Sequence, residues 1–379
     1  MTYQGGPPPA AAKLPEPGWL PDPARTDLER YWNGWSWTSR TRDRVTKIER
    51  VLYNPAAYSS TTYNPAPWAP AKPKRRSLLG PLLALLMVVL LAYGVLGYLG
   101  RLPASAPYAQ QLEQSEPTAP TVDYPIFGST ELVQYVARAM VAQEESIDVS
   151  YWLTVGGVSE QGLTDALLEV GAQNPYIYAD SWTVVTQGPK VWVEPDYTYS
   201  GREAEGRRAA TQAAVTSALA SLHITAATPA REAIKAIHDY LASHATYDHT
   251  AYQEILADSH ADSLRVDQSQ EAYGILVAGT AVCNGYAKAF QAMAQAAGLQ
   301  TVIVTGTATG LTTGGHAWNR VLVDGQWLTV DVTWDDADGA SPTRYEYFLV
   351  DNNAAVLGSR TADLDWVVDQ NLGNYGSVR

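Results

Sequence analysis

Three residues in the C-terminal half of the chain have the types and the order that acyl-transfer chemistry needs. Cys283 is the one cysteine among 379 residues, His316 follows it by 33 positions, and Asp331 follows His316 by 15. A thiol attacks a carbonyl efficiently when a base takes its proton, and the base works best when a third group fixes its tautomer. The three residue types therefore predict a thiol nucleophile with a base and an orienting carboxylate.

The element expected to carry Cys283 is a helix within residues 279–298, GTAVCNGYAKAFQAMAQAAG. Ala287, Phe290 and two further alanines recur on one helical face, and Gly298 suits the position just after a helix. Cys283 is then expected at or near the helix N-terminus. There the unpaired N–H groups and the positive end of the helix dipole favour a thiolate.

The other two residues are expected on a β-hairpin. Two runs of strand character, 316–323 and 326–334, are joined by the dipeptide 324–325, Asp-Gly, which is a strong signal for a two-residue turn. This turn sets residue 323 opposite residue 326. His316 and Asp331 then become diagonal neighbours on one face, with backbones about 7–8 Å apart. An imidazole–carboxylate hydrogen bond is within reach of the side chains.

Residues 229–350 resemble the transglutaminase-like superfamily, in its bacterial branch. The matching stretches are AIHDYLASHATYD (236–248), AYGILVAGTAVCNGYAKAF (272–290), GHAWNRVLVDGQWLTVDVTWDD (315–336) and YEYFLV (345–350). The resemblance implies a papain-like α+β core, with Cys283 as nucleophile, His316 as general base and then acid, and Asp331 as the orienting residue. The backbone N–H of Cys283 would be one donor to the oxyanion, by its position.

Alternative roles are weighed beside these. A lone cysteine is often an inert apolar residue of the core. Trp318 and Trp334 are candidate substrate-binding residues lining an acyl-donor cleft, or else ordinary core side chains. The candidate metal ligands His244, Asp248, His249 and His260 match no standard spacing of such ligands. We predict no metal and no cofactor.

Three residues of this kind do not determine which reaction follows. Cys283 would attack an amide and leave a thioester. Water as the acceptor gives a protease or amidase, whereas a lysine amine gives a cross-linking transglutaminase. The alternative class is a non-catalytic scaffold that links an outer ligand to a cytoplasmic partner.

Charge is distributed unevenly along the chain. Residues 1–76 carry 12 Lys+Arg and 6 Asp+Glu, net +6, and residues 77–379 carry 14 and 33, net −19, which together give −13. This acidic balance argues against nucleic acid as a partner. The single cysteine excludes an intrachain disulfide.

The boundary between the two charge regions is a predicted membrane span. Residues 78–99 have no charged side chain, and these 22 residues would form a helix about 33 Å long, enough for a hydrocarbon core of about 30 Å. Basic residues gather in 72–76, directly before this segment, and Arg101 alone follows closely. The positive-inside rule predicts a single-pass protein of the cell membrane, with its N-terminus cytoplasmic and residues 102–379 outside.

The expected architecture is therefore modular and of the α+β class. Residues 15–45 are predicted to form a Trp-rich cytoplasmic module, with strands and an Asn33-Gly34 turn. Within it, residues 17–42 resemble a short domain of unknown function found at the N-termini of many bacterial membrane proteins. The predicted boundaries are 46–77 for a Pro-rich linker, 78–99 for the span, 102–122 for a stalk, 123–228 for an α+β segment and 229–360 for the catalytic domain. Expected partners are peptide or protein substrates, those of the cell wall included, and a protein that binds the Trp-rich module.

Overall fold

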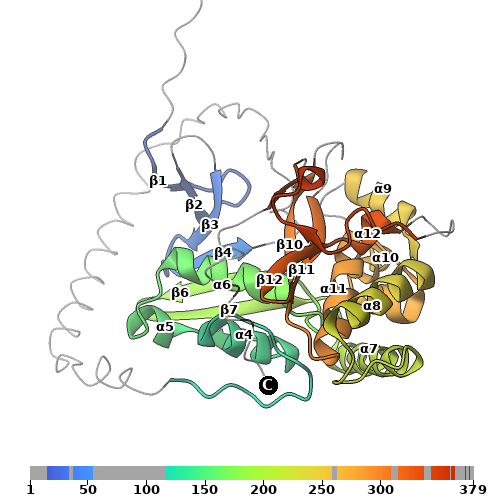
Figure 1. The fold of residues 1–379 in the computed structure, drawn as a ribbon. Coiled ribbons are helices and arrows are strands. Elements are labelled where there is room, and N and C mark those ends of the chain that lie inside the picture. Colours follow the sequence, from blue (N-terminus) through green and yellow to red (C-terminus); the bar gives the residue numbers. More distant parts are fainter. Residues whose placement is uncertain are drawn as a thin grey trace, which may run out of the picture. The chain divides into compact units, whose positions relative to one another are not determined.

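The computed structural model describes residues 15–33, 37–53, 116–257, 263–308, 315–336, 343–358, 360–362, 372 and 375. Within these residues, a five-stranded sheet and a seven-stranded sheet are packed with helices (Figure 1). The order of the five-stranded sheet is β13-β12-β11-β10-β14, and every neighbouring pair is antiparallel. Its strands are β10 (Thr301–Ala308), β11 (Gly315–Val323), β12 (Gln326–Val330), β13 (Val350–Asp351) and β14 (Arg360–Ala362).

The hairpin β11–β12 has the predicted register. Val323 pairs with Gln326, and the turn residues Asp324 and Gly325 have φ of 52° and 80°. Two positive φ values are what a type I′ turn requires, and that turn matches the twist of the strands. The prediction of a strand to residue 334 was wrong, because β12 ends at Val330 and a short helix, α12 (Val332–Asp335), follows.

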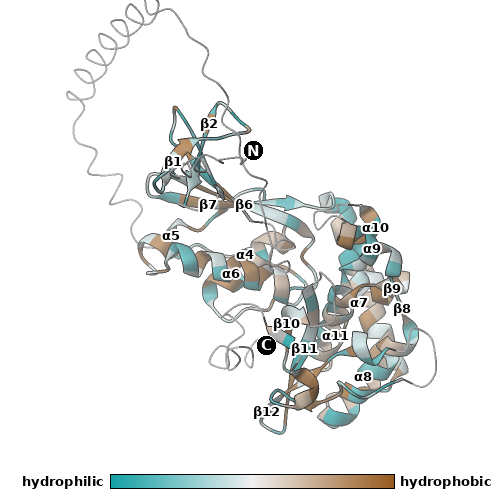
Figure 2. Cartoon of the chain, turned by 90° about the horizontal axis from the view of Figure 1, so that it is seen from above, coloured by the Kyte–Doolittle hydropathy of each residue, from teal (hydrophilic) through white to brown (hydrophobic). Residues whose placement is uncertain are grey.

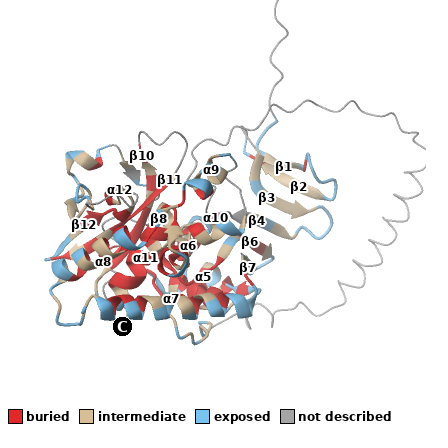
Figure 3. Cartoon of the chain, turned by 90° about the vertical axis from the view of Figure 1, so that its right-hand side faces the viewer, coloured by how far each residue is buried: buried red, intermediate tan, exposed pale blue. Residues whose placement is uncertain are grey.

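Helix α11 (Cys283–Ala296) packs against β10 and β11, with α7 (Gly201–Ser221) and α8 (Ala230–His244) beside it. Figure 3 shows α11 mostly in the colour of buried residues. Its apolar face supplies Phe290 and Met293 to a core shared with α8, β11 and β12. The helix ends as predicted, because Gly298 has a φ of 79°.

Short elements complete this half of the described chain. Strands β8 and β9 form a parallel pair that leads directly into α11. The elements are β8 (Thr246–Tyr247), α9 (His249–Ala257), α10 (Leu264–Ser269), the π-helix η1 (Gly274–Ala278), β9 (Thr280–Ala281) and the 3₁₀-helix η2 (Ala355–Leu357).

The seven-stranded sheet has the order β1-β2-β3-β4-β6-β7-β5. Its strands are β1 (Gly18–Pro21), β2 (Leu28–Trp32), β3 (Trp37–Asp43), β4 (Glu49–Tyr53), β5 (Ile147–Asp148), β6 (Ala179–Gln187) and β7 (Lys190–Tyr197). Helices α4 (Glu131–Val141), α5 (Ser150–Thr154) and α6 (Glu160–Gln173) accompany it, and α4 and α6 lie side by side (Figure 2).

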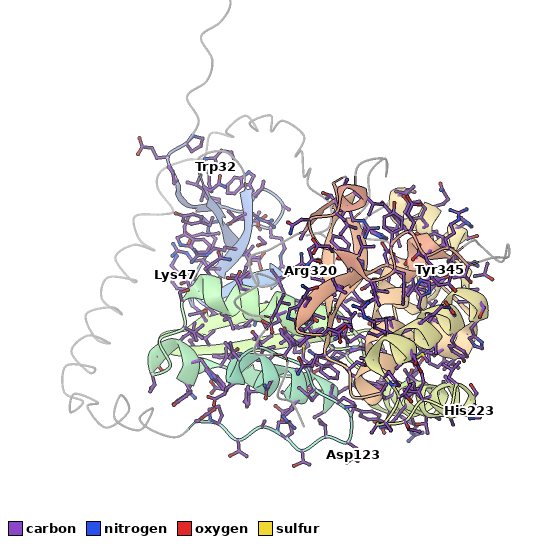
Figure 4. The ribbon with its side chains drawn as sticks, viewed as in Figure 1. Trp32, Lys47, Asp123, His223, Arg320 and Tyr345 are labelled. Atoms are coloured by element: carbon purple, nitrogen blue, oxygen red, sulfur yellow. The ribbon has the colours of Figure 1, made fainter. Side chains whose placement is uncertain are left out.

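The tryptophans of the N-terminal module pack against one another. Trp32, labelled in Figure 4, is buried and meets Trp37 edge-on with ring centroids 5.4 Å apart. Its indole N–H donates to the carbonyl of Pro15. The predicted Asn33-Gly34 turn includes Gly34, which lies outside the described residues. The predicted linker 46–77 begins too early, since Glu49–Tyr53 is strand β4.

Strand β4 pairs with β6, and this ladder bears on the predicted topology. Glu49 pairs with Thr186 and Val51 with Val184. Neighbouring strands of one sheet must lie on the same side of a membrane. The predicted topology separates residues 1–77 from residues 102–379, so this ladder and that topology make different predictions for the side on which the N-terminus lies. Across the described residues, no helix is both long and apolar enough to span a bilayer, and the predicted span 78–99 lies outside them.

The segment 123–173 packs against the five-stranded sheet. Phe127 joins Val302, Val304 and Trp318 in one buried cluster. The buried amide of Gln173 accepts from the N–H of Ile303 at 2.9 Å and donates to its carbonyl at 2.7 Å. Ala119 and Val122 also pack on the core of this segment, so the C-terminal part of the predicted stalk belongs to the folded structure.

Candidate active site

Cys283 is the first residue of helix α11, as the sequence predicts. Val282 is the residue before the helix, and its N–H donates to the carbonyl of Ser269 at 2.9 Å, which ties the entry to α10. The Cys283 side chain is half-buried and packs against Ile303 of β10 and Ala317 of β11. The first N–H groups of a helix have no partner within it, so the thiol lies where an anion is favoured.

Gly285 holds the first turn of α11 close to the preceding chain. A Cβ at this position would lie 2.5 Å from the carbonyl oxygen of Ser269 and 2.6 Å from the Cβ of Ala281. Neither neighbour can move without displacing backbone. The position of Cys283 therefore depends on a residue without a side chain two positions later.

Gly285→Ala is expected to destabilise the protein by about 3 kcal/mol and to slow alkylation of Cys283, because the helix start must shift. Gly206→Ala in α7 is the matched control, since a Cβ there meets nothing within 4 Å. That change should stabilise the helix by about 0.5–1 kcal/mol. Urea unfolding measures the change in the free energy of unfolding of both variants. Equal changes in the two variants would contradict the assigned role of Gly285.

His316 lies near the start of β11 with an exposed fraction of 4%. Its Nε2 is 2.6 Å from Oδ2 of Asp331. Because the carboxyl is ionised, Nε2 carries the hydrogen and donates it. The thiol of Cys283 also raises the pKa of this ring. Because Nε2 is bonded to Asp331, Nδ1 is the ring nitrogen left to take the thiol proton.

Asp331 is placed by three different groups. It is the N-cap of α12, and its Oδ1 accepts the N–H of Trp334 at 3.1 Å. Its own N–H donates to the carbonyl of Tyr347 at 3.1 Å. Asp331 has an exposed fraction of 1%, and its Oδ2 lies against Nε2 of His316. The sequence predicted Asp331 within a strand. In the structure it is instead the N-cap of α12, and the capping hydrogen bond fixes the rotamer of its side chain.

The charges of His316 and Asp331 stabilise each other. Burial would lower the pKa of His316, but the charge and hydrogen bond of Asp331, with help from Cys283, outweigh burial and raise that pKa to about 9. Burial would likewise raise the pKa of Asp331, yet the charges of His316 and Arg360 and the N–H of Trp334 hold it below its usual value. An imidazolium is thus favoured beside the thiol.

Two segments of the chain are similar to known protein families. Residues 217–332 match the family model of the transglutaminase-like superfamily. The chain carries a transglutaminase-like domain. Residues 17–49 match the model of a second family, a protein of unknown function (DUF2510).

Two curated relatives are similar to part of the chain. Kyphoscoliosis peptidase from Mus musculus is 34% identical over 114 residues, with coverage of 27% of this chain and 15% of that protein. The protein of the same name from Homo sapiens is 33% identical over 114 residues, with the same coverage. The chain therefore spans about a seventh of the length of these relatives. A solved structure described as a TGase is 18% identical, with a TM-score of 0.31 over 48% of this chain and 50% of that one.

The two predicted substrate-binding tryptophans of the transglutaminase-like domain differ in how far they are buried. Trp318 is 5% exposed and packs in a cluster with Phe127 and Val304, so its predicted contact with substrate does not fit its burial. Its ring lies against His316 at 5.8 Å. Trp334 is partly exposed and stacks on His316 at 4.9 Å. Trp334 alone of the two remains a candidate for contact with substrate.

Two residues near the triad were absent from the sequence prediction. Arg360 of β14 lies with its Nη2 2.7 Å from Oδ2 of Asp331. Tyr252 of α9 packs against Val282, and burial together with the charge of Cys283 raises the pKa of its hydroxyl. Neither residue belongs to a recognisable motif. The aromatic character of segment 247–252 was the one available signal for Tyr252.

The contacts of His238 indicate a structural role for this residue. It is fully buried in α8, with Nε2 3.1 Å from Asp335 and Nδ1 3.1 Å from Asp239. Tyr345, labelled in Figure 4, stacks on its ring at 5.4 Å. Among the residues that the structure describes, no group of three or more His, Cys, Asp or Glu side chains could hold a metal ion, and the candidate ligand His260 lies outside them.

Proposed function

We propose that the protein is a cysteine enzyme that transfers acyl groups from amide or peptide substrates through a thioester. The observation that carries this proposal is the buried pair of His316 and Asp331, at 2.6 Å, with the thiol of Cys283 as the remaining partner of the imidazole. A base, its orienting carboxylate and a nucleophile at a helix start are the components that thiol catalysis uses.

The proposed steps follow from this arrangement. The proton of the Cys283 thiol moves to Nδ1 of His316, and the sulfur attacks the amide carbonyl carbon. The N–H of Cys283 would donate to the oxyanion. The C–N bond then breaks as His316 returns the proton to the leaving nitrogen, and a thioester remains. An acceptor loses its proton to His316, attacks the thioester, and restores the thiol.

Water is the acceptor we put first, giving hydrolysis of a peptide or amide bond. The curated relatives are named peptidases, which supports this choice. A primary amine is the second acceptor, giving a cross-link. The proposed substrates are peptides or proteins, those linked to the cell wall included, and neither a metal nor a cofactor takes part.

The test uses the full chain and its Cys283→Ala variant, each incubated with Gln-containing and cell-wall peptides and a labelled primary amine. We expect products from the wild type alone, by mass spectrometry. Shortened peptides or loss of ammonia indicate water as the acceptor, whereas addition of the amine indicates cross-linking. His244→Gln, at an exposed histidine of α8, is the control and should match the wild type.

Identical spectra from the wild type and Cys283→Ala would overturn catalysis on these substrates. They would favour the alternative, a scaffold that links an outer ligand to a partner of the Trp-rich module. A scaffold has no use for an activated thiol. Its Cys283 should therefore react with iodoacetamide at pH 7 no faster than the thiol of an unstructured peptide.

We also propose that segment 78–99 anchors the protein in the cell membrane. The uncharged run and the basic residues before it support this. The protein should remain in membranes after carbonate extraction. Protease protection of tags at each end of the chain decides the orientation: opposite sides agree with the charge pattern, and the same side agrees with the β4–β6 ladder.

A further inference from the structure

Arg360 is a buried cation in direct contact with the carboxylate that orients His316. Its side chain is 3% exposed, and its Nη2 lies 2.7 Å from Oδ2 of Asp331. The same oxygen accepts a hydrogen bond from Nε2 of His316 at 2.6 Å. The contact is mainly one of charge, because Nη2 is not aligned as a hydrogen-bond donor. Two cationic groups therefore share one oxygen of one carboxylate whenever the imidazole is protonated.

The register of the sheet explains how a residue so late in the chain reaches the site. Arg360 pairs with Ala308 of β10, and Gly306 of β10 pairs with His316. Paired residues share a face, and positions two apart on a strand share it too. Arg360 and His316 therefore lie on one face. The strand between them presents there only a methyl group and a hydrogen, from Ala308 and Gly306, so the long Arg360 side chain can cross to Asp331.

Three aromatic rings surround the guanidinium. Its central carbon lies 4.1 Å from the ring centroid of Trp334, 4.6 Å from that of Tyr347 and 5.2 Å from that of Trp318. The faces of aromatic rings attract a cation, and a planar guanidinium stacks on them where an ammonium does not. Trp334 and Trp318 also stack on His316. One aromatic layer thus holds both the imidazole and the guanidinium.

We propose that Arg360 is a positioning residue that, by sharing the Asp331 carboxylate with His316, limits how tightly His316 holds its proton. This inference rests on the proposed function, because it assigns Arg360 a part in the same acyl transfer. A base that also serves as an acid must release its proton to the leaving group. A full, unshared carboxylate beside His316 would hold that proton too strongly, and the neighbouring guanidinium offsets part of this attraction.

The charged and titratable groups around Asp331 come from several elements. His316 lies on β11, Cys283 on α11, Arg360 on β14 and Asp335 on α12, and the Tyr347 hydroxyl adds a neutral group. Arg360 is the permanent cation among these groups. A like charge within about 4–6 Å shifts a titration by about one unit or more. Loss of Arg360 should thus move the titration of His316 upward.

The experiment follows the rate of alkylation of Cys283 by iodoacetamide against pH, in the full chain. Because the chain has one cysteine, the label reports this thiol alone, and no substrate is needed. The alkaline transition of the profile reports loss of the imidazolium proton. In Arg360→Met it should move up by about one pH unit. In Arg360→Lys, which keeps the charge, the pH of the transition should move by less than about half of that amount.

Arg344→Met is the matched control, because it removes an exposed arginine from the same part of the chain and should leave the transition in place. Should Arg360→Met fail to fold, Tyr347→Leu removes one ring from around the guanidinium and should give a smaller shift in the same direction. Slower alkylation in every Arg360 variant with an unmoved transition would overturn the proposal and leave a purely structural role. This outcome would leave the proposed function standing, since that function depends on Cys283-dependent products.

Discussion

Replacing Asp331 by alanine is expected to cause the largest loss of function of any change outside the nucleophile. The carboxylate binds His316 at 2.6 Å and Arg360 at 2.7 Å, and it caps α12. Without it, two buried groups lose their anionic partner, and His316 loses the bond that fixes its tautomer. Loss of the orienting carboxylate lowers turnover by roughly 10⁴-fold in a serine-protease triad. We expect a fall of similar order here.

The same change should also destabilise the fold. Removing one partner of a buried charge pair costs about 3–5 kcal/mol, because the other charge stays buried and unpaired. Asp331→Asn keeps an oxygen that can accept the N–H of Trp334, so it should lose turnover with a smaller loss of stability. Urea unfolding at pH 7 and steady-state turnover measure the two effects separately.

Asp324→Asn is the matched control for Asp331→Asn. Asp324 pairs with Arg231 at 3.0 Å, but both side chains are more than half exposed. Exposed pairs contribute about 0–1 kcal/mol. Asparagine also tolerates the positive φ of this turn position. Equal losses at positions 331 and 324 would show that burial of the Asp331 charge is not what makes it important.

The second large effect is a fall in stability at alkaline pH that depends on His316. Its pKa is raised to about 9 in the folded protein, against about 6.5 when unfolded. A raised pKa means that the folded state holds the proton more tightly. The resulting stabilisation is complete below about pH 6.5 and is lost as the pH rises through about 9, with a total of about 3 kcal/mol.

The measurement is the free energy of unfolding between pH 6 and pH 10, for the wild type and for His316→Gln. Glutamine can still donate to Asp331 but does not titrate, so the difference between the two proteins should shrink across this window. His244→Gln, at an exposed histidine, should follow the wild-type curve. A difference between wild type and His316→Gln that is constant from pH 6 to 10 would show that His316 is not protonated more readily when folded.

The sequence determined the local geometry of the hairpin and of the helix that carry the candidate site residues. Asp324-Gly325 requires positive φ at two adjacent positions, and this turn sets the register up to Asn319 and Val330. The start of α11 at Cys283 was likewise predictable, because an apolar face of helical spacing begins there and Gly298 ends it. Such features depend on neighbours in the chain and need no knowledge of the rest of the fold.

Tertiary structure decided what surrounds these residues. Asp331 is a helix cap rather than a strand residue, since the chain turns to bury Val332 and Asp335. Trp318 became core because Phe127, almost 200 positions away, covers it. Arg360 reaches Asp331 because an edge strand pairs with β10 next to two small residues. Burial and ion pairing between distant segments have no periodicity along the chain, so composition and spacing carry no record of them.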